Sequence, residues 1–441
     1  MDYKKGEKII EGKTKIIWAC EDNPKLVIVE SKNDITAYDN PDLTKRFKTK
    51  AVHSTTVTCQ VFALLKRAGI PVAYESQISA TEFLAPDCKM IPLEVVARRY
   101  AVGSFLKRHP ELSIKNNEDP HRFHNLVTEF FLKTTRGSLT TENGERILEG
   151  LDPQAGEEDP FIVNPYEEYW KLHHAKKPAW DVDVSLNKEI EASKILSGNF
   201  IAKMKEMDEI LRKVFLVLEG VWNTLGLRII DIKIEFGVDK EGKLMVADVI
   251  DNDSWRLKDA LWEELSKEAF RQGEELDEVE RKYGLVASLT KKFRIPKQAL
   301  VLWRGSDSDP LPELGLFENT TGVVIENVVL SGHKSTRQCL DALEKILGKY
   351  PDGGVILAKV GRSNGLGPIV AARTSWPVIA VPATIDSFPE DVWSSIRMPS
   401  KVPLATAWPE SNAMLLAAEI LAQKNPVLHQ KRQMMIEKLD E

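Results

Sequence analysis

The chain has 441 residues and a formal net charge of −6 at pH 7. At roughly 100–200 residues per domain, this length corresponds to about two to four domains. Hydrophobic residues make up 43% and charged residues 29%, which excludes a collagen-like or disordered chain. The acidic charge balance argues against a general nucleic-acid-binding protein and against a protein that binds anionic membranes.

The cysteines and the N-terminus bear on the cell compartment. Cys20, Cys59, Cys88 and Cys339 are far apart and form no C-x-x-C pair, so neither a zinc site nor a disulfide framework is expected. The first residues contain no apolar signal segment, and no apolar run approaches the ~18 residues of a membrane helix. We therefore expect a cytoplasmic protein with free thiols.

Residues 1–260 combine short strands, helices and long polar loops, which predicts one mixed domain of helices and strands. Gly69 and Pro71 end an amphipathic helical pattern. Residues 136–165 are rich in Gly, Glu, Asp and Pro, which is typical of a long surface loop or insertion. The regular elements expected here are strands at 16–18 and 26–29 and helices at 55–68 and 187–225.

Residues 261–295 are strongly charged, with Glu, Lys and Arg at helical spacing, and they predict an exposed helical connector. From residue 296 onward, continuous apolar strands alternate with helical stretches, which is typical of a parallel sheet covered on both faces. We therefore place a doubly wound, flavodoxin-like α/β domain at 296–425, followed by a charged C-terminal tail at 426–441. Its strands are expected at 299–303, 323–330, 354–360 and 376–381, and its clearest helix at 335–348.

The segment Gly12-Lys13-Thr14-Lys15 has some features of a P-loop. The preceding glycine, Gly6, is one residue too far upstream, and strand-like residues lie on both sides, whereas a P-loop requires a helix after the lysine. A glycine turn with two lysines between strands instead suits a flap over nucleotide phosphates, because glycine permits close approach of the backbone. A solvated hairpin without a ligand is the alternative.

The alternation from residue 231 to residue 248 predicts a β-hairpin. In the register expected from its turn, Lys233 faces Asp248, and Glu235 is diagonal to Asp248 on the same sheet face. Two carboxylates and a lysine suit a magnesium ion that bridges ATP phosphates, because Mg²⁺ takes few hard oxygen ligands from the protein. A cross-strand salt bridge is the alternative.

Two further segments concentrate charge. Residues 248–256 hold three acids, an arginine and a tryptophan, a density that a plain surface turn does not need. Residues 98–108 combine a Gly-Ser turn with arginines that could bind a phosphate-bearing substrate. A basic surface helix is the alternative for this second segment.

These motifs, in this order, resemble the SAICAR synthetase family over nearly all of residues 5–257. The resemblance implies an α+β fold of the kinase-like or ATP-grasp-like type. It also implies a reaction that joins the carboxylate of CAIR to the amine of aspartate with ATP and Mg²⁺. The motifs that carry it are Glu11-Gly-Lys-Thr-Lys15, Met90-Ile-Pro-Leu-Glu94 with Arg98 to Arg108, Lys233-Ile-Glu-Phe-Gly237 and Asp248 to Arg256.

The same resemblance implies roles for single residues. Glu235 and Asp248 would bind the metal, and Lys233 and Asp253 would serve in catalysis. The chain departs from the family at residues 133–160, where a long insertion that ends at Asp159-Pro160 replaces a short Asp-rich loop. ATP binding is implied for Gly12, Lys13, Thr14, Lys15, Met90, Glu94, Lys233 and Asp248. Binding of CAIR or aspartate is implied for Asp39, Arg98, Ser104, Lys107, Asp253 and Arg256.

Three loops that follow the first three strands of the C-terminal domain form a second candidate site, at residues 305–309, 331–334 and 361–368. Because the carboxyl ends of parallel strands meet at one edge of a sheet, the loops should converge on one crevice, where a Gly-Ser loop suits a phosphate. His333 is one of eight histidines, and histidine suits proton transfer near neutral pH. A structural or solvent-facing histidine is the alternative.

These loops resemble the AIR carboxylase family, in the class that uses carbon dioxide directly, over about residues 298–422. The resemblance implies carboxylation of the imidazole C4 of AIR without biotin, ATP or metal, with His333 and Lys334 as catalytic residues. The chain departs from the family at Gly332, at Lys359 and at 310–321, which is too broken for the helix expected there. The implied site for AIR and CO₂ consists of Gly305, Ser306, Asp309, Ser331, His333, Lys334, Gly361, Arg362, Ser363, Asn364 and Gly365.

A chain with both domains resembles the bifunctional animal enzymes that catalyse two successive steps of de novo purine synthesis. The implied substrates are AIR, CO₂, CAIR and L-aspartate, and the implied assembly is a homo-octamer. No nucleic acid and no membrane is expected as a partner. The alternative is a monofunctional SAICAR synthetase whose C-terminal domain is an assembly scaffold, which the departures at Gly332, Lys359 and 310–321 motivate.

Overall fold

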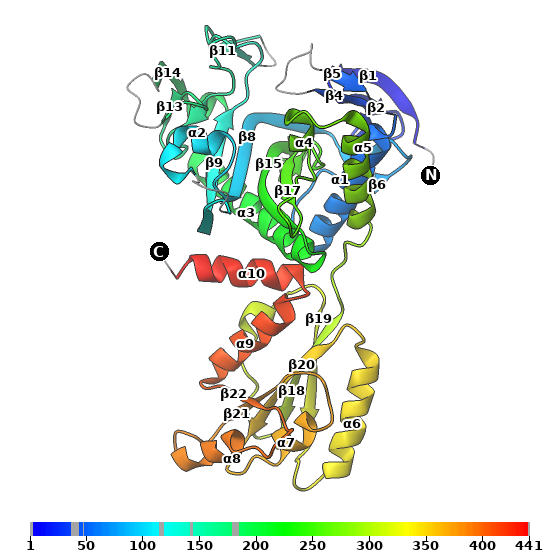
Figure 1. Cartoon of the computed structure of the whole chain (residues 1–441), viewed down its shortest axis with the longest axis vertical. Coiled ribbons are helices and arrows are strands. Elements are labelled where there is room, and N and C mark those ends of the chain that lie inside the picture. Colours follow the sequence, from blue (N-terminus) through cyan, green and yellow to red (C-terminus); the bar gives the residue numbers. More distant parts are fainter. Residues whose placement is uncertain are drawn as a thin grey trace. The chain divides into compact units, whose positions relative to one another are not determined.

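The computed structural model of the chain describes residues 3–36, 44–46, 48–113, 119–141, 144–178 and 185–439. Its internal contacts divide the chain into two compact units, unit 1 (Met1–Phe293) and unit 2 (Arg294–Glu441), whose elements are labelled in Figure 1. Within the described residues, every helix is too short or too polar to cross a membrane. The four cysteines are free thiols, and three of them are buried.

Unit 1 contains two antiparallel sheets. The first has five strands, in the order β1 (Lys5–Glu11), β2 (Lys15–Cys20), β3 (Leu26–Ser31), β7 (Glu82–Pro86) and β6 (Ser76–Gln77). The second has eight strands, in the order β14 (Ser185–Glu191), β13 (Tyr169–His173), β12 (Phe161–Ile162), β9 (Arg122–Leu132), β8 (Cys88–Tyr100), β15 (Arg228–Asp239) and β16 (Leu244–Ala247), with β17 (Trp255–Lys258) also paired to β15. The strands predicted at 16–18 and 26–29 are confirmed as β2 and β3.

The described part of unit 1 also contains two separate two-stranded sheets. β4 (Asp34–Thr36) pairs with β5 (Thr44–Arg46), and β10 (Leu139–Thr140) pairs with β11 (Arg146–Leu148). Strands β10, β11 and β12 all lie within residues 136–165. This segment, expected as a surface loop, therefore contains regular structure as well.

Helix α3 (Phe200–Thr224) covers one face of the eight-stranded sheet. It packs against β8 and β15, and Trp222 on α3 meets Trp255 on β17 with ring centroids 5.7 Å apart. Ile232 pairs with Trp255, so the apolar side chains of β15 face the helix, because successive side chains alternate between the two faces of a strand. The intervening positions 231, 233 and 235 therefore face away from α3.

The start of α3 is marked by a cap. The side chain of Asn199 accepts a hydrogen bond from the backbone amide of Ala202, which satisfies one donor of the first turn. The helix predicted at 187–225 is therefore wrong before residue 200. Residues 185–191 instead form β14, where a period of two buries Ile190 opposite Trp170 of β13.

Helix α5 (Leu276–Thr290) lies in the segment predicted as an exposed connector, and it packs against α1 (Lys50–Arg67). Tyr283 is 1% exposed, and Val279 and Val286 are fully buried. The predicted exposure is wrong for this helix because apolar residues three and four positions apart form a stripe that faces α1. In the structure residues 261–293 belong to unit 1. The helix predicted at 55–68 is confirmed as α1, which starts at Lys50.

Unit 2 is a five-stranded parallel sheet with helices on both faces. Its strands lie in the order β19 (Val323–Val329), β18 (Gln298–Arg304), β20 (Gly354–Val360), β21 (Val378–Pro382) and β22 (Ala405–Thr406). In chain order this is 2-1-3-4-5, the order of flavodoxin-like folds. Helices α6 (Thr336–Lys349) and α7 (Leu366–Ala371) cover one face, and α9 (Glu410–Ala422) covers the other. The predicted doubly wound domain and its four strands are confirmed.

Two further segments of unit 2 bear on the predictions. Helix α10 (Pro426–Glu437) packs against α9 and buries Leu428 in the same core, so most of the segment expected as a tail is an integral helix. Between β18 and β19 the described chain forms only a 3₁₀ turn, Gly315–Phe317. The prolines and glycine at 310–321 predict that no long helix forms there, as observed.

Gly354 offers a test of the packing of unit 2. A Cβ atom at this position would lie 2.3 Å from the ring of Trp376 and 2.6 Å from the carbonyl oxygen of Ala299. Gly354→Ala should therefore lower the free energy of unfolding of unit 2 by about 1–3 kcal/mol, because overpacking forces neighbours apart. Scanning calorimetry of the full chain measures the effect. The control is Gly348→Ala in α6, where nothing lies within 4 Å and a gain of about 0.5–1 kcal/mol is expected; equal effects would contradict the packing argument.

Candidate functional sites

The pairing of three strands places charged side chains on the sheet face opposite α3. β8 pairs with β15 so that Glu94 lies opposite Glu235 and Arg98 lies opposite Asp231. β17 pairs on the other side of β15 and puts Arg256 opposite Asp231. One face thus carries two neighbouring groups of charges, one at Glu235 and one at Asp231.

The group at Glu235 consists of three ion pairs between lysines and carboxylates. Lys233 on β15 pairs with Glu94 on β8, and Lys133, just after β9, pairs with Glu235. The third pair joins Lys15, at the start of β2, to Asp248. The five-stranded sheet and the eight-stranded sheet therefore both contribute to this group.

The predicted hairpin register is wrong by one residue. Val238 pairs with Leu244 and Glu235 with Ala247, so Lys233 does not face Asp248. A slip of one residue would send Asp248 to the opposite face. The residue instead follows the strand with φ +65°, and its carboxylate turns back to Lys15.

Burial and charge shift the pKa values of this group in opposite directions. Burial lowers the pKa of Lys15 to about 8, although the charge of Glu235 raises it. Burial alone would raise the pKa of Glu235, but the charges of Lys133, Lys233 and Lys15 outweigh burial and lower it. Glu235 is therefore anionic at neutral pH and has three cations around it.

Asp159 lies close to the group at Glu235, and the sequence reasoning did not assign it a role. It lies between β11 and β12, and its carboxylate accepts hydrogen bonds from the amide (2.8 Å) and hydroxyl (3.3 Å) of Thr134. Burial, with the charges of Glu94 and Glu158, raises the pKa of Asp159 to about 6, and Lys233 opposes that rise. From the sequence, Asp159-Pro160 was expected only as the end of an insertion, with no role for Asp159.

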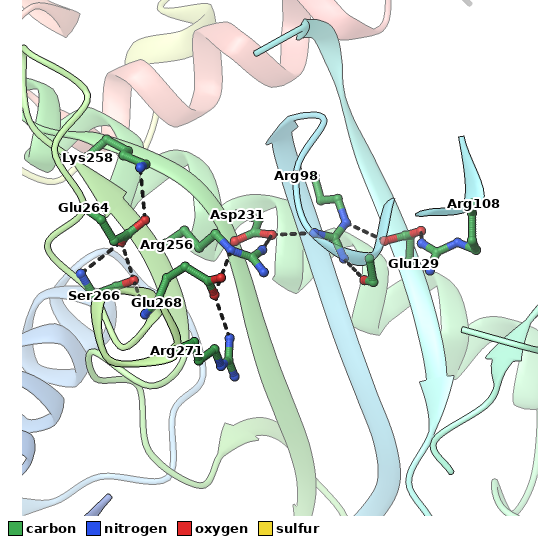
Figure 2. Close-up of polar contacts among 11 residues, drawn as sticks. Arg98, Arg108, Glu129, Asp231, Arg256, Lys258, Glu264, Ser266, Glu268 and Arg271 are labelled. Atoms are coloured by element: carbon green, nitrogen blue, oxygen red, sulfur yellow. Dashed lines mark hydrogen bonds and ion pairs between the residues drawn. The ribbon is translucent and has the colours of Figure 1, made fainter. Parts of the chain in front are cut away.

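The group at Asp231 is a row of alternating charges, which Figure 2 shows. Asp231 binds the guanidinium groups of both Arg98 and Arg256. In order, the row is Arg108, Glu129, Arg98, Asp231, Arg256, Glu268 and Arg271. It runs from Arg108, the last residue of α2 (Ser104–Arg108), through the sheet to α4 (Glu268–Arg271).

Arg98 and Arg256 both bind Asp231, but they differ in exposure and in their other contacts. Arg98 is 3% exposed and also lies 3.4 Å from the hydroxyl of Ser104, so its donors are directed at protein groups. Arg256 is more exposed and lies against Gly103, which has φ +61°. A Cβ at Gly103 would lie 2.5 Å from the Arg256 guanidinium, so only glycine permits this contact. Lys107 is exposed in α2 (Ser104–Arg108).

The carboxylate of Asp253 contacts two lysines and a tyrosine that the sequence reasoning did not assign to a site. Its Oδ2 lies 3.3 Å from Lys50 Nζ and 3.1 Å from Lys267 Nζ, and its Oδ1 accepts a hydrogen bond of 2.5 Å from Tyr283. Burial would raise the pKa of Asp253, but the two lysines outweigh burial and lower it. Lys267 and Tyr283 were missed because their segment was interpreted as a connector. Asp39 lies outside the described residues.

The ATP-binding residues predicted from the motifs are only partly brought together. Lys15, Glu94, Lys233 and Asp248 lie in the group at Glu235. Gly12, Lys13 and Thr14 form the turn between β1 and β2, closed by a 2.9 Å bond from the Gly12 amide to the Lys15 carbonyl. Met90 is 41% exposed on β8, opposite Gly237.

In unit 2 the second and third predicted loops are in contact. The His333 ring lies 3.5 Å from the Ser363 hydroxyl, and a Cβ at Gly365 would lie 2.5 Å from that ring. A Cβ at Gly332 would lie 2.6 Å from the amide of Leu366. Gly332, one of the expected departures from the AIR carboxylase family, therefore lies where the two loops approach too closely for a side chain.

The remaining residues of these loops differ in what they contact. Asn364 is buried and holds its own loop, since it donates to the Ser395 hydroxyl at 3.0 Å and accepts from the Gly367 amide at 2.7 Å. Arg362 lies over the Phe388 ring, 4.0 Å from its centroid. The other predicted positions, at the same edge of the sheet, are Gly305, Ser306, Asp309, Ser331, Lys334 and Gly361.

Substitution of Asp231 tests the row of charges. Asp231→Asn leaves Arg98 and Arg256 facing each other without the carboxylate between them, so we expect unit 1 to lose about 3–5 kcal/mol of stability. Calorimetry of the full chain should show a lower unfolding temperature for unit 1 and no change for unit 2. Glu268→Gln, at the more exposed end of the row, should cost less. A loss no greater than that of Glu268→Gln would contradict a central role for Asp231.

Comparison with known proteins covers both units. The SAICAR synthetase family matches residues 8–152 and 174–287, and the AIR carboxylase family matches residues 300–441. The probable multifunctional protein ADE2 of Caenorhabditis elegans is 33% identical over 96% of this chain and 92% of its own length. The bifunctional phosphoribosylaminoimidazole carboxylase/phosphoribosylaminoimidazole succinocarboxamide synthetase of Homo sapiens is 32% identical over 97% of this chain and 92% of its own length.

Solved structures resemble each part of the chain. Phosphoribosylaminoimidazole-succinocarboxamide synthase from Ehrlichia chaffeensis is 25% identical, with a TM-score of 0.49, and the match covers 65% of this chain and 100% of that one. PurE from Treponema denticola is 27% identical, with a TM-score of 0.29, and the match covers 32% of this chain and 92% of that one. From the sequence matches over both units, the chain belongs to the family of bifunctional AIR carboxylase/SAICAR synthetases, enzymes of de novo purine biosynthesis.

Proposed function

We propose that unit 1 binds ATP between the turn of β1–β2 and the face of the eight-stranded sheet, and uses it to activate the carboxylate of CAIR for attack by the amine of L-aspartate. The observation that carries this proposal is the convergence of Lys15, Lys133 and Lys233 with Glu94 and Glu235 on one face. A carboxylate is a poor electrophile, so ATP must first convert it to an acyl phosphate. The three lysines suit the negative charge of the phosphoryl groups during that step.

The carboxylates of this group fit a magnesium ion. Glu235 and Asp248 both interact with Lys15, and their oxygens are the hard ligands that Mg²⁺ takes. In the described ranges no three His, Cys, Asp or Glu side chains come close enough to form a metal site of their own, which agrees with an ion that phosphate oxygens help to hold. In this position Mg²⁺ would neutralise phosphate charge.

The substrate CAIR is assigned to the region of Ser104, Lys107 and Arg256. Arg256 is the more exposed arginine bound to Asp231, so it is the one suited to contact a phosphate. Arg98 lies behind it and positions it through Asp231. Asp253, whose pKa is lowered, is a weak base and suits binding of the ammonium group of aspartate.

Unit 2 is proposed to carboxylate AIR at the edge where its strands end. The nucleophilic imidazole C4 attacks CO₂, a carbon–carbon bond forms, and the proton on C4 passes to His333. Ser306 and Asp309 would bind the ribose-phosphate part of AIR, and Lys334 would lie beside the developing carboxylate. No biotin or ATP takes part. The homo-octamer remains a prediction from the family resemblance, and the cytoplasmic location remains a prediction from the cysteines and the lack of a signal or membrane segment in the sequence.

His333→Ala tests the carboxylase. Purified full chain receives AIR and bicarbonate without ATP or aspartate, and CAIR is followed by its ultraviolet absorbance. We expect the variant to lose about 10²–10⁴-fold in carboxylation, since the ring proton lacks an acceptor. Ligation of CAIR to SAICAR by the same preparation is the internal control and should not change. A wild-type chain that ligates but does not carboxylate would favour the scaffold alternative.

Glu235→Gln tests the metal assignment in unit 1. Loss of one carboxylate charge should raise the Mg²⁺ concentration needed for half-maximal ligation at least about tenfold. Initial rates of ADP release against Mg²⁺ at fixed ATP measure this shift. The matched control is Glu241→Gln. Glu241 lies in the turn between β15 and β16 and pairs with Lys25, just before β3. Unchanged magnesium dependence in Glu235→Gln would refute the assignment.

A further inference from the structure

The first loop of unit 2 is not followed by the helix that usually supports such a loop. In doubly wound sheets, the loop after the first strand leads into a helix whose N-terminus binds a phosphate. Here β18 ends at Arg304, and residues 305–314 lead only to the 3₁₀ turn Gly315–Phe317. The loop has hydrogen bonds of its own, such as the one from the Ser306 amide to the Asp309 carboxylate (3.1 Å), and it also contacts side chains at the ends of the strands.

Two cations at the ends of neighbouring strands bind the loop through its backbone. Arg304 Nη1 donates to the carbonyl oxygen of Asp307 at 3.3 Å and also to that of Asp309. Lys359 Nζ donates to the carbonyl oxygen of Pro310 at 2.8 Å. Three carbonyls of one short loop are thus bound by two charged donors, which form stronger hydrogen bonds than neutral donors do.

The sheet register brings the two cations together. Arg304 on β18 is paired with Lys359 on β20, and paired residues point to the same face of a sheet. Glu410, the first residue of α9, holds Lys359 with an ion pair of 3.0 Å. The side chains of Arg304 and Lys359 are only 13% and 10% exposed, so both lie under the loop.

The space beside these cations is too small for a substrate. A cavity of about 10 Å³ is lined by Arg304, Lys359, Glu410 and Pro312, among others. This volume holds one water molecule at most. The cations therefore do not contact the substrate from this side, and any effect on the reaction must pass through the loop.

We propose that Arg304 and Lys359 are positioning residues of the carboxylase site. They hold residues 305–310 in the conformation that presents Ser306 and Asp309 to AIR, in place of a helix N-terminus. This role rests on the proposed function of the loop as the AIR site.

Kinetics of full-chain Lys359→Met test the proposal. The substitution keeps the length of the side chain but removes the donor to Pro310. The KM for AIR should rise about 10- to 100-fold, while kcat changes less than about threefold, because substrate positioning weakens and the chemical groups stay intact. Lys359→Arg retains a charged donor and should restore most of the affinity. Arg304→Met should act in the same direction.

Hydrogen exchange supplies a readout that is independent of catalysis. In Lys359→Met, amides at 306–311 should exchange faster, while β18 and β20 keep their protection. The matched control is Lys349→Met, which breaks another lysine–glutamate pair of unit 2, with Glu326, away from this loop. It should change neither the KM nor exchange at 306–311.

The outcomes separate the inference from the function on which it rests. An unchanged KM and unchanged exchange in both Lys359→Met and Arg304→Met would overturn the inference, even if His333→Ala confirms the carboxylase. A wild-type chain without carboxylation would instead overturn the proposed function. If Lys359→Met loses its fold, seen as lost protection in β18 and β20, Lys359→Gln replaces it and is judged by the same two measurements.

Discussion

The register of β8 against β15 is the constraint on which the proposed ligase site depends. It places two carboxylates, Glu94 and Glu235, directly opposite each other, an arrangement that is unfavourable unless cations intervene. Lys233 and Lys133 supply them. A slip of one residue would move one strand's charges onto the face that α3 covers, so the apolar packing of α3 and the polar site specify the same register.

The same sheet face uses charge in two ways. At Asp231 the row of arginines and acids is mostly buried and its members bind one another, so it holds its side chains in one arrangement. At Glu235 each carboxylate has a lysine that is partly exposed. In the proposed complex with ATP and Mg²⁺, the lysines would turn to phosphate and the carboxylates to the metal, without leaving a buried charge unpaired.

Unit 2 supports its first loop differently from most sheets of this topology. Helix dipoles and free amides normally bind phosphate at this place. In this chain the segment at 310–321 forms only a short 3₁₀ turn. The side chains of Arg304 and Lys359 bind backbone carbonyls of residues 307–310 instead. Arg304 and Lys359 can do so because adjacent parallel strands end side by side at one edge of the sheet.

Much of the fold could be predicted from local pattern. The apolar runs of unit 2 correspond to its strands because parallel strands covered on both faces need continuous apolar sequence. The errors arose where tertiary contacts decide. Residues 185–191 pair with β13 rather than extend α3, and the charged segment around Tyr283 buries one stripe against α1. The partner of residues 185–191 is the preceding strand, whereas α1 is far from Tyr283 in the sequence.

Short motifs were enough to indicate the family, the two-part organisation and the types of residue suited to phosphate, metal and imidazole. Which of those residues lie together depends on how the chain folds. The hairpin register was one residue away from the prediction, and the φ of Asp248 at +65° returned its carboxylate to Lys15. Asp159 came close to Glu94 and Lys233. Such contacts depend on the register between distant strands and on single backbone angles, which local sequence patterns do not specify.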